Sequence, residues 1–130
     1  MKSYTDIEQS KLLAKILPLE SADMYYCYGM DIHTKKWDYD IVPTIIDASN
    51  QIDIGDIPCW SLSALSEFIL PYIADDDGNN YKFYLSKDGL DRWVAYYKSD
   101  DVSIHICEES DNMIDVIFEM VCWLKKEEYI

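Results

Sequence analysis

A chain of 130 residues with 49% hydrophobic and 14% aromatic side chains can build one packed core, which excludes a disordered chain and predicts a single domain over residues 1–130. Acidic side chains outnumber basic ones by 25 to 11, so the net charge is −14 and the surface potential is negative. This charge disfavours direct binding to nucleic acid or to an anionic membrane. A large net charge also keeps a protein soluble, and this alone could account for the excess of acids. We therefore expect a protein partner. If the negative charge takes part in binding, the surface of that partner should be basic.

The N-terminal residues mix charged with apolar side chains, unlike a secretory signal. No apolar run approaches the roughly 20 residues of a membrane-spanning helix. The four cysteines form no Cys-x-x-Cys pair, so their spacing indicates neither a zinc site nor a redox motif. We expect a cytoplasmic protein with reduced thiols.

The first predicted helix begins at Thr5, because Thr5 and Glu8 have the spacing of a capping box, in which each side chain satisfies a free backbone N–H. Its apolar stripe is short, and Pro18 is expected to end it. A strand is expected over about 37–46. Pro43 cannot donate to a strand ladder, so it either places this strand at a sheet edge or divides it.

The middle of the chain predicts a long polar loop over 47–57 and then a second helix. Ser61 or Ser63 is expected to cap this helix, and Pro71 to end it. The acidic stretch 75–80 predicts a surface turn. It does not predict a calcium loop, because the first and last ligand positions of an EF-hand would fall on apolar or aromatic side chains.

Three segments with alternating apolar residues predict an antiparallel meander over about 81–107, with a hairpin turn at Asp88-Gly89. The same alternation places His105 and Cys107 on the face opposite to the apolar one. The side chains expected on the apolar face are Tyr81, Phe83, Leu85, Trp93, Ala95, Tyr97, Val102, Ile104 and Ile106.

The C-terminal segment predicts a helix from about Asp111 to Lys126, with Ser110 or Asp111 as its N-cap and lysines at the negative end of its macrodipole. A meander with one apolar face must cover that face, so we expect the helix to pack on it. The side chains expected in this contact are Ile114, Ile117, Phe118 and Val121. The sequence therefore predicts an α+β fold, in which an antiparallel sheet is packed by a C-terminal helix and accompanied by two further helices.

No residue that could carry chemistry has the spacing of a known site, so we expect no catalytic, cofactor-binding or metal-ligating residue. His33 and His105 lack a second ligand at helical spacing. His105 and Cys107 could touch as neighbours on one strand face, but the sequence supplies neither an orienting group nor oxyanion donors for them. Capping explains two of the three serines at 61, 63 and 66, and four glycines are too few to favour a phosphate loop.

A cluster of aromatic residues between positions 25 and 39 favours an interaction surface. Tyrosine and tryptophan supply large contact areas and are enriched at interaction hot spots. The alternative is that they pack a half-buried layer of the fold. The candidate interaction residues are Tyr25, Tyr26, Tyr28, Trp37 and Tyr39.

Three segments carry a resemblance to other proteins. Residues 1–10 read MKSYTDIEQS, residues 16–24 read ILPLESADM, and residues 58–65 read PCWSLSAL. In these segments, and over most of its length, the chain resembles a group of small uncharacterised proteins of gut Bacteroidales and their phages. The resemblance implies a phage or mobile-element context. It implies no activity and supplies no site residue.

Three classes of function are compatible with these patterns. A protein-interaction (adaptor) domain explains a compact fold with many tyrosines and no catalytic motif, and it is the favoured hypothesis. An acidic, nucleic-acid-mimicking inhibitor could instead occupy the basic groove of a DNA- or RNA-binding protein. An enzyme of unrecognised type is the third class. The first two differ in whether the acids form one face and whether the tyrosines are exposed.

Overall fold

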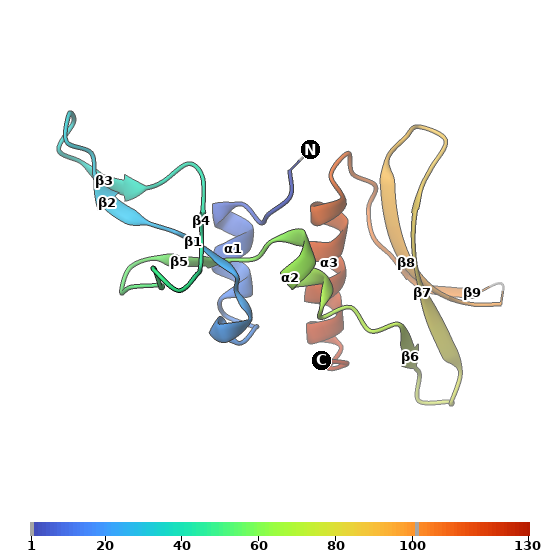
Figure 1. Ribbon diagram of the computed structural model, residues 1–130. Helices are drawn as coiled ribbons and strands as arrows, with labels where there is room; N and C mark the ends of the chain where they lie inside the picture. Colours follow the sequence, from blue (N-terminus) through green and yellow to red (C-terminus); the bar gives the residue numbers. More distant parts are fainter. Residues whose placement is uncertain (1, 101) are drawn as a thin grey trace. The chain divides into compact units, whose positions relative to one another are not determined.

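The computed structural model describes residues 2–100 and 102–130 and confirms the predicted α+β class (Figure 1). Asp101, which falls in the predicted turn before the last strand of the meander, lies outside the described residues. The chain divides into two compact units, Tyr4–Ala64 and Leu65–Ile130 with Met1–Ser3. The single domain over 1–130 stays a prediction. None of the helices in the described part of the chain has the length and apolar content needed to span a bilayer.

The unit Tyr4–Ala64 combines short helices with two small antiparallel sheets. Its elements are α1 (Ile7–Leu13), the 3-10 helix η1 (Leu19–Ser21), β1 (Met24–Tyr26), β2 (Tyr28–Met30), β3 (Trp37–Tyr39), β4 (Thr44–Ile45), β5 (Ile57–Cys59) and the start of α2 (Leu62–Ser66). One sheet has the strand order β4-β1-β5, and the other is the hairpin β2-β3. A small core beneath them contains Tyr26, Ile57 and Cys59.

Helix α1 begins one residue later than the capping-box spacing predicts. Asp6 is its N-cap: an Asp6 carboxylate oxygen accepts from the Gln9 N–H at 2.8 Å, and Gln9 Oε1 accepts from the Asp6 N–H at 3.0 Å. Thr5 is buried instead. Its Oγ1 accepts from the Trp60 N–H at 3.1 Å and lies 2.8 Å from Ser10 Oγ. The prediction was wrong because this hydroxyl is already satisfied inside the unit.

Prolines mark two breaks in this unit, and a third proline lies within a strand. Helix α1 ends at Leu13, before Pro18, and Pro18 is the N-cap of η1. Pro43 separates β3 from β4, which belong to two different sheets, so the strand expected over about 37–46 is divided and does not extend the meander. Pro58 lies in β5, an edge strand, where a missing N–H is tolerated.

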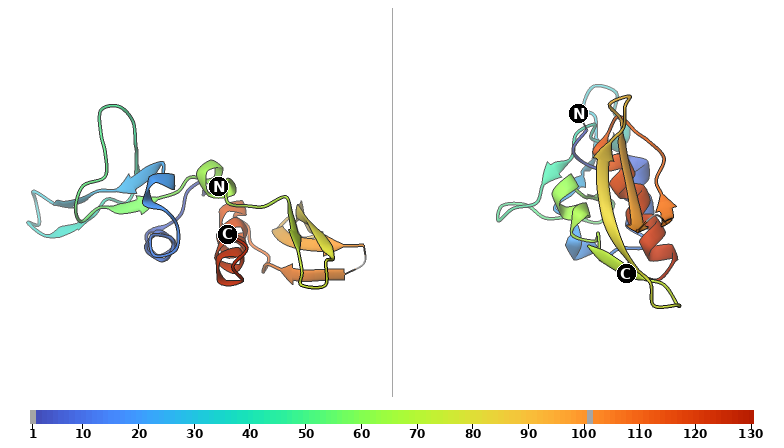
Figure 2. Two further views of the ribbon diagram at one scale, coloured as in Figure 1. Left: turned by 90° about the horizontal axis from the view of Figure 1, so that it is seen from below. Right: turned by 90° about the vertical axis from the view of Figure 1, so that its right-hand side faces the viewer.

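The unit Leu65–Ile130 contains a four-stranded antiparallel sheet in the order β6-β7-β8-β9, and α3 lies along one face of it (Figure 2). Its elements are β6 (Tyr72–Ala74), β7 (Asn80–Lys87), β8 (Trp93–Ser99), β9 (Val102–Ile106) and α3 (Met113–Lys126). The predicted three-stranded meander is confirmed, and β6 adds a fourth strand. In the β7–β8 turn, Asp88 accepts from the N–H groups of Leu90 and Arg92 at 2.8 and 3.1 Å.

Two helices begin close to their predicted caps. Ser61 caps α2, since its hydroxyl accepts from the Ala64 N–H at 3.1 Å. Helix α3 has Asn112 as its N-cap, one residue beyond the predicted positions. Ser110 accepts from the Asn112 N–H at 3.2 Å, so it orders the chain just before the helix.

Helix α3 packs on the sheet with a different face from the one predicted. Ile114, Ile117 and Val121 are buried but do not belong to the core cluster under the sheet, and Phe118 is only partly buried. The helix is apolar around more than one face, so its apolar spacing cannot identify the face that meets the sheet. The buried members of the cluster are Ile73, Tyr81, Ala95, Tyr97, Cys107, Val116, Met120 and Leu124.

Strand β9 also turns a different face toward the helix. Of the side chains expected inward, Val102 and Ile106 are exposed and Ile104 is partly buried against the cluster. Cys107 is buried in the cluster, and His105 stacks on the Trp123 ring of α3. The predicted orientation of His105 and Cys107, away from the core, was therefore wrong.

A β-bulge explains the reversal of the side chains from His105 onward; Val102 precedes the bulge and is exposed at the start of the strand. Tyr97 pairs with His105, but Lys98 pairs with Ser103, so the register shifts and Ile104 is the extra residue. Tyr97 points inward, as predicted, and its partner His105 does the same. A bulge of one residue moves all later side chains of a strand to the other face, and alternation alone does not reveal it.

Candidate functional site

The hairpin β2-β3 carries aromatic side chains on a two-stranded ladder. Tyr28 pairs with Tyr39, and Met30 pairs with Trp37. Within its own unit, the hairpin extends away from α1 (Figures 1 and 2). Tyr39 packs against the small core of the unit, which fixes one end of the hairpin there.

The turn that closes the hairpin is organised by Asp31. One of its carboxylate oxygens accepts from the N–H groups of His33 and Thr34 at 2.7 and 3.1 Å. Its backbone accepts from the Lys35 N–H at 2.7 Å and donates to the Lys36 carbonyl at 2.9 Å. Lys35 has a φ of 57°, in the left-handed region that tight turns require. These bonds hold the turn in one geometry, while the packing of Tyr39 and the bond from the Tyr28 N–H to an Asp56 carboxylate oxygen at 3.0 Å tie the hairpin to the rest of its unit.

Three aromatic rings form a continuous cluster on the hairpin. The Tyr28 ring lies 5.6 Å from the Trp37 ring and 4.9 Å from the Tyr39 ring, measured between centroids. Trp37 is nonetheless 61% exposed and Tyr28 is 41% exposed. Ring pairs across a ladder stabilise a two-stranded sheet that would otherwise be marginal. We call Tyr28, Met30, Trp37 and Tyr39 the aromatic hairpin surface.

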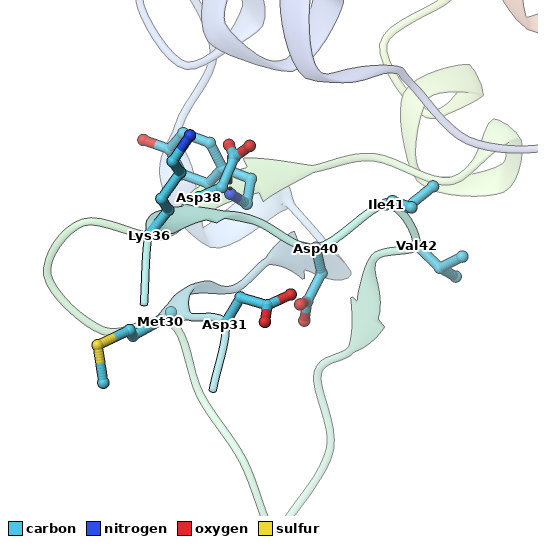
Figure 3. Close-up of a pocket in the computed structure, with 9 residues that line it drawn as sticks. Met30, Asp31, Lys36, Asp38, Asp40, Ile41 and Val42 are labelled. Atoms are coloured by element: carbon cyan, nitrogen blue, oxygen red, sulfur yellow. Dashed lines mark hydrogen bonds between the residues drawn. The ribbon is translucent and has the colours of Figure 1, made fainter. Parts of the chain in front are cut away.

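A groove of about 680 Å³ adjoins this surface (Figure 3). Ile41 and Val42 form part of its wall and are 92% and 62% exposed. Its charged lining consists of three aspartates and one lysine, so its net charge is −2. The full set of lining residues is Gly29, Met30, Asp31, Lys36, Asp38, Tyr39, Asp40, Ile41 and Val42.

The structure brings together three of the five predicted interaction residues. Tyr28, Trp37 and Tyr39 form the ring cluster. Tyr25 and Tyr26 are buried in β1, where the Tyr26 hydroxyl donates to the Thr5 carbonyl at 2.8 Å and burial raises the pKa of Tyr26. Both are therefore packing residues, as the alternative interpretation held.

Sequence reasoning missed the apolar wall of the groove. Ile41 and Val42 precede Pro43 in a segment without regular structure, so no periodicity marks them. Their exposure becomes evident only when the strands on both sides of Pro43 are known to belong to different sheets.

The acidic stretch 75–80 is a self-satisfied turn. The Asp75 carboxylate accepts from the Asp77 N–H at 3.0 Å, from the Asn79 N–H and Nδ2 at 2.8 and 3.0 Å, and from the Tyr81 hydroxyl at 3.0 Å. These bonds, led by the one from the Asn79 side chain, lower the pKa of Asp75. The carboxylate organises a turn, as the sequence predicts.

His105 and Cys107 lie together inside the other unit. The distance from His105 Nε2 to Cys107 Sγ is 3.7 Å. Burial raises the pKa of Cys107 to about 12, so the sulfur is a protonated thiol at neutral pH. Because the thiolate is the nucleophilic form, this pair does not have the features of a catalytic Cys–His dyad.

Comparison with known proteins adds no assignment. No protein-family model, no curated protein and no solved structure matches this chain. The resemblance to proteins of gut Bacteroidales and their phages thus stays a prediction. The geometry of the hairpin and its groove is the basis for assigning a function.

Proposed function

We propose that this chain is a protein-interaction (adaptor) domain that binds its partner through the aromatic hairpin surface and the adjoining groove. The exposure of Trp37 beside Tyr28, with the exposed Ile41 and Val42 lining the adjoining groove, carries this proposal. A contiguous exposed apolar patch is uncommon on a monomer and marks interaction sites. Tryptophan and tyrosine are also the residues most enriched at hot spots.

The charge of the groove supports a basic partner. Asp31, Asp38 and Asp40 outnumber Lys36 along it, and the whole chain carries a net charge of −14. A segment with an apolar side chain next to lysine or arginine would place the apolar group on the rings and the cation beside the aspartates. The aromatic anchors supply most of the affinity, whereas the charges steer the encounter and select the partner.

The biological setting is part of the same proposal. A phage or mobile-element context rests on the resemblance of the three sequence segments, and a cytoplasmic location rests on the composition of the chain. Both settings fit an adaptor that binds another protein through a small exposed patch.

Selection from a displayed library of random peptides tests the proposal, because it requires no identified partner. We expect the selected peptides to combine an aromatic or aliphatic residue with lysine or arginine. Trp37→Ala should weaken their binding by at least about 30-fold, since loss of a hot spot costs about 2 kcal/mol or more.

Tyr72→Ala is the matched control. Tyr72 is 61% exposed, the same fraction as Trp37, but it lies in β6, outside the proposed surface. Its loss should leave the affinity unchanged. Selected peptides that bind Trp37→Ala as tightly as the wild type would contradict the proposal, provided that circular dichroism shows the variant to be folded.

A further inference from the structure

A second cluster of polar side chains lies in the unit Leu65–Ile130, independent of the hairpin. His105 comes from β9, Cys107 follows this strand directly, and Glu119 comes from α3. One ligand-type atom from each side chain lies within 4.8 Å of the other two. This is a set of one nitrogen, one sulfur and one oxygen donor at a junction between sheet and helix.

The fold holds these donors in place. The β9 bulge turns His105 and Cys107 toward α3. The His105 ring then stacks on Trp123, with 4.4 Å between the ring centroids and 5° between their planes. Glu119 and Trp123 are four residues apart on α3, so they project from the same side of the helix. The Glu119 carboxylate also accepts from the Glu108 N–H, at 3.5 Å.

We propose that His105, Cys107 and Glu119 bind one Zn²⁺ ion. Zinc in proteins takes thiolate, imidazole and carboxylate ligands in tetrahedral geometry, with bonds of about 2.3 Å to sulfur and about 2.0–2.1 Å to nitrogen. At a tetrahedral angle these bonds place the nitrogen and the sulfur about 3.6 Å apart. The distance between His105 Nε2 and Cys107 Sγ is 3.7 Å.

The donor types favour zinc over the other common divalent ions. Calcium and magnesium prefer oxygen ligands throughout, whereas a set that includes sulfur and nitrogen suits zinc. A carboxylate oxygen of the partly buried Glu119 lies within 4.8 Å of the other two donors, so ion binding would draw it closer to complete the set, and the fourth position is left for water. Binding breaks the S–H bond of Cys107, whose electron pair forms the Zn–S bond while the proton passes to solvent.

Access to the site comes from the side of His105 and Glu119. Cys107 is only 1% exposed, but both other donors are partly buried and reach the surface. The same three atoms could instead form only a local contact, in which the thiol and the imidazole share a hydrogen bond. Titration with a metal separates these two arrangements.

The test is titration of the full-length, chelator-treated protein with Co²⁺, which replaces zinc and absorbs light. We expect one equivalent to give a thiolate-to-metal charge-transfer band and the visible bands of a tetrahedral site, and Zn²⁺ to displace it. Cys107→Ser should abolish the charge-transfer band. His105→Gln and Glu119→Gln should each weaken Zn²⁺ binding by at least about 100-fold, the upper end of the losses seen for residues that only support a ligand.

Matched controls come from residues of the same type. His33→Gln and Cys27→Ser change the only other histidine and a cysteine of the other unit, and both should keep the band. Because Cys107 is buried, its variant could fail to fold. In that case two other results decide whether zinc binds: the spectrum of the wild type, and the Zn²⁺ affinity of a Glu119→Gln variant that circular dichroism shows to be folded. The absence of a thiolate band in the wild type, or equal Zn²⁺ affinity in folded Glu119→Gln, would overturn the proposal.

Discussion

The reversed face of β9 leads to a quantitative prediction for Ile106. This residue is 60% exposed in the structure, although the sequence alternation places it inward, under the helix. Ile106→Thr removes about two methylene-sized groups, each worth about 0.8 kcal/mol when fully buried. With roughly two fifths of the side chain buried, the expected loss of unfolding free energy is about 0.6 kcal/mol. An inward Ile106 would instead cost about 3 kcal/mol or more, because the new hydroxyl would also be buried.

Met120→Ala provides the buried counterpart. Met120 is fully buried in the cluster between α3 and the sheet. The substitution removes about three methylene-sized groups, whose burial contributes about 2.4 kcal/mol to the free energy of unfolding. The cavity left behind adds about 1 kcal/mol to the loss. The expected total is about 3–4 kcal/mol.

Urea denaturation followed by far-UV circular dichroism measures both variants. If the unfolding free energy falls with urea concentration at the same slope in the wild type and in both variants, the variants differ from the wild type only in stability. Ile106→Thr should lie close to the wild type and Met120→Ala well below it. A cost for Ile106→Thr as large as that for Met120→Ala would refute the bulge and the strand face derived from it.

Two further predictions concern titration and redox state. Burial raises the pKa of Tyr97 from 10.0 to about 12. Tyrosine in the unfolded chain ionises near its ordinary pKa, so the stabilisation is complete below about pH 10 and is lost as the pH rises toward 12. Urea midpoints should fall over that range and fall less in Tyr97→Phe, and identical pH profiles for the two proteins would contradict this. All four cysteines are free, so thermal melting should be the same with and without a thiol reductant, and a lower midpoint with reductant would reveal a disulfide.

The sequence predicts those elements whose signal is local. The β7–β8 hairpin follows from alternation and from Asp88-Gly89, and the Asp75 turn follows from its own side chains. The faces of β9 and α3 could not be predicted in the same way. One extra residue at Ile104 reverses the end of β9, and an apolar helix such as α3 offers more than one face to its neighbours.

In the candidate sites, too, the sequence predicts the local features but not those that depend on packing. The sequence locates the aromatic stretch. It does not reveal that β1 ends before Cys27 and that β2 begins after it, which leaves Tyr26 buried and Tyr28 exposed. Strand alternation predicts His105 and Cys107 as neighbours, with the wrong orientation. Glu119 is twelve residues farther along the chain, on a helix, and only the packing of that helix on the sheet brings its carboxylate to them.

Salt dependence of binding tests most directly whether the aromatic hairpin surface is the functional one. A selected peptide ligand is titrated by calorimetry at low and high salt into the wild type, Trp37→Ala and Tyr72→Ala. If the rings anchor the partner, affinity should fall only modestly with salt, drop by at least about 30-fold in Trp37→Ala and persist in Tyr72→Ala. An acidic inhibitor that mimics nucleic acid would instead bind its ligand with a steep salt dependence and compete with nucleic acid. Steep salt dependence with equal affinity for Trp37→Ala and the wild type would contradict the interaction surface proposed for β2-β3.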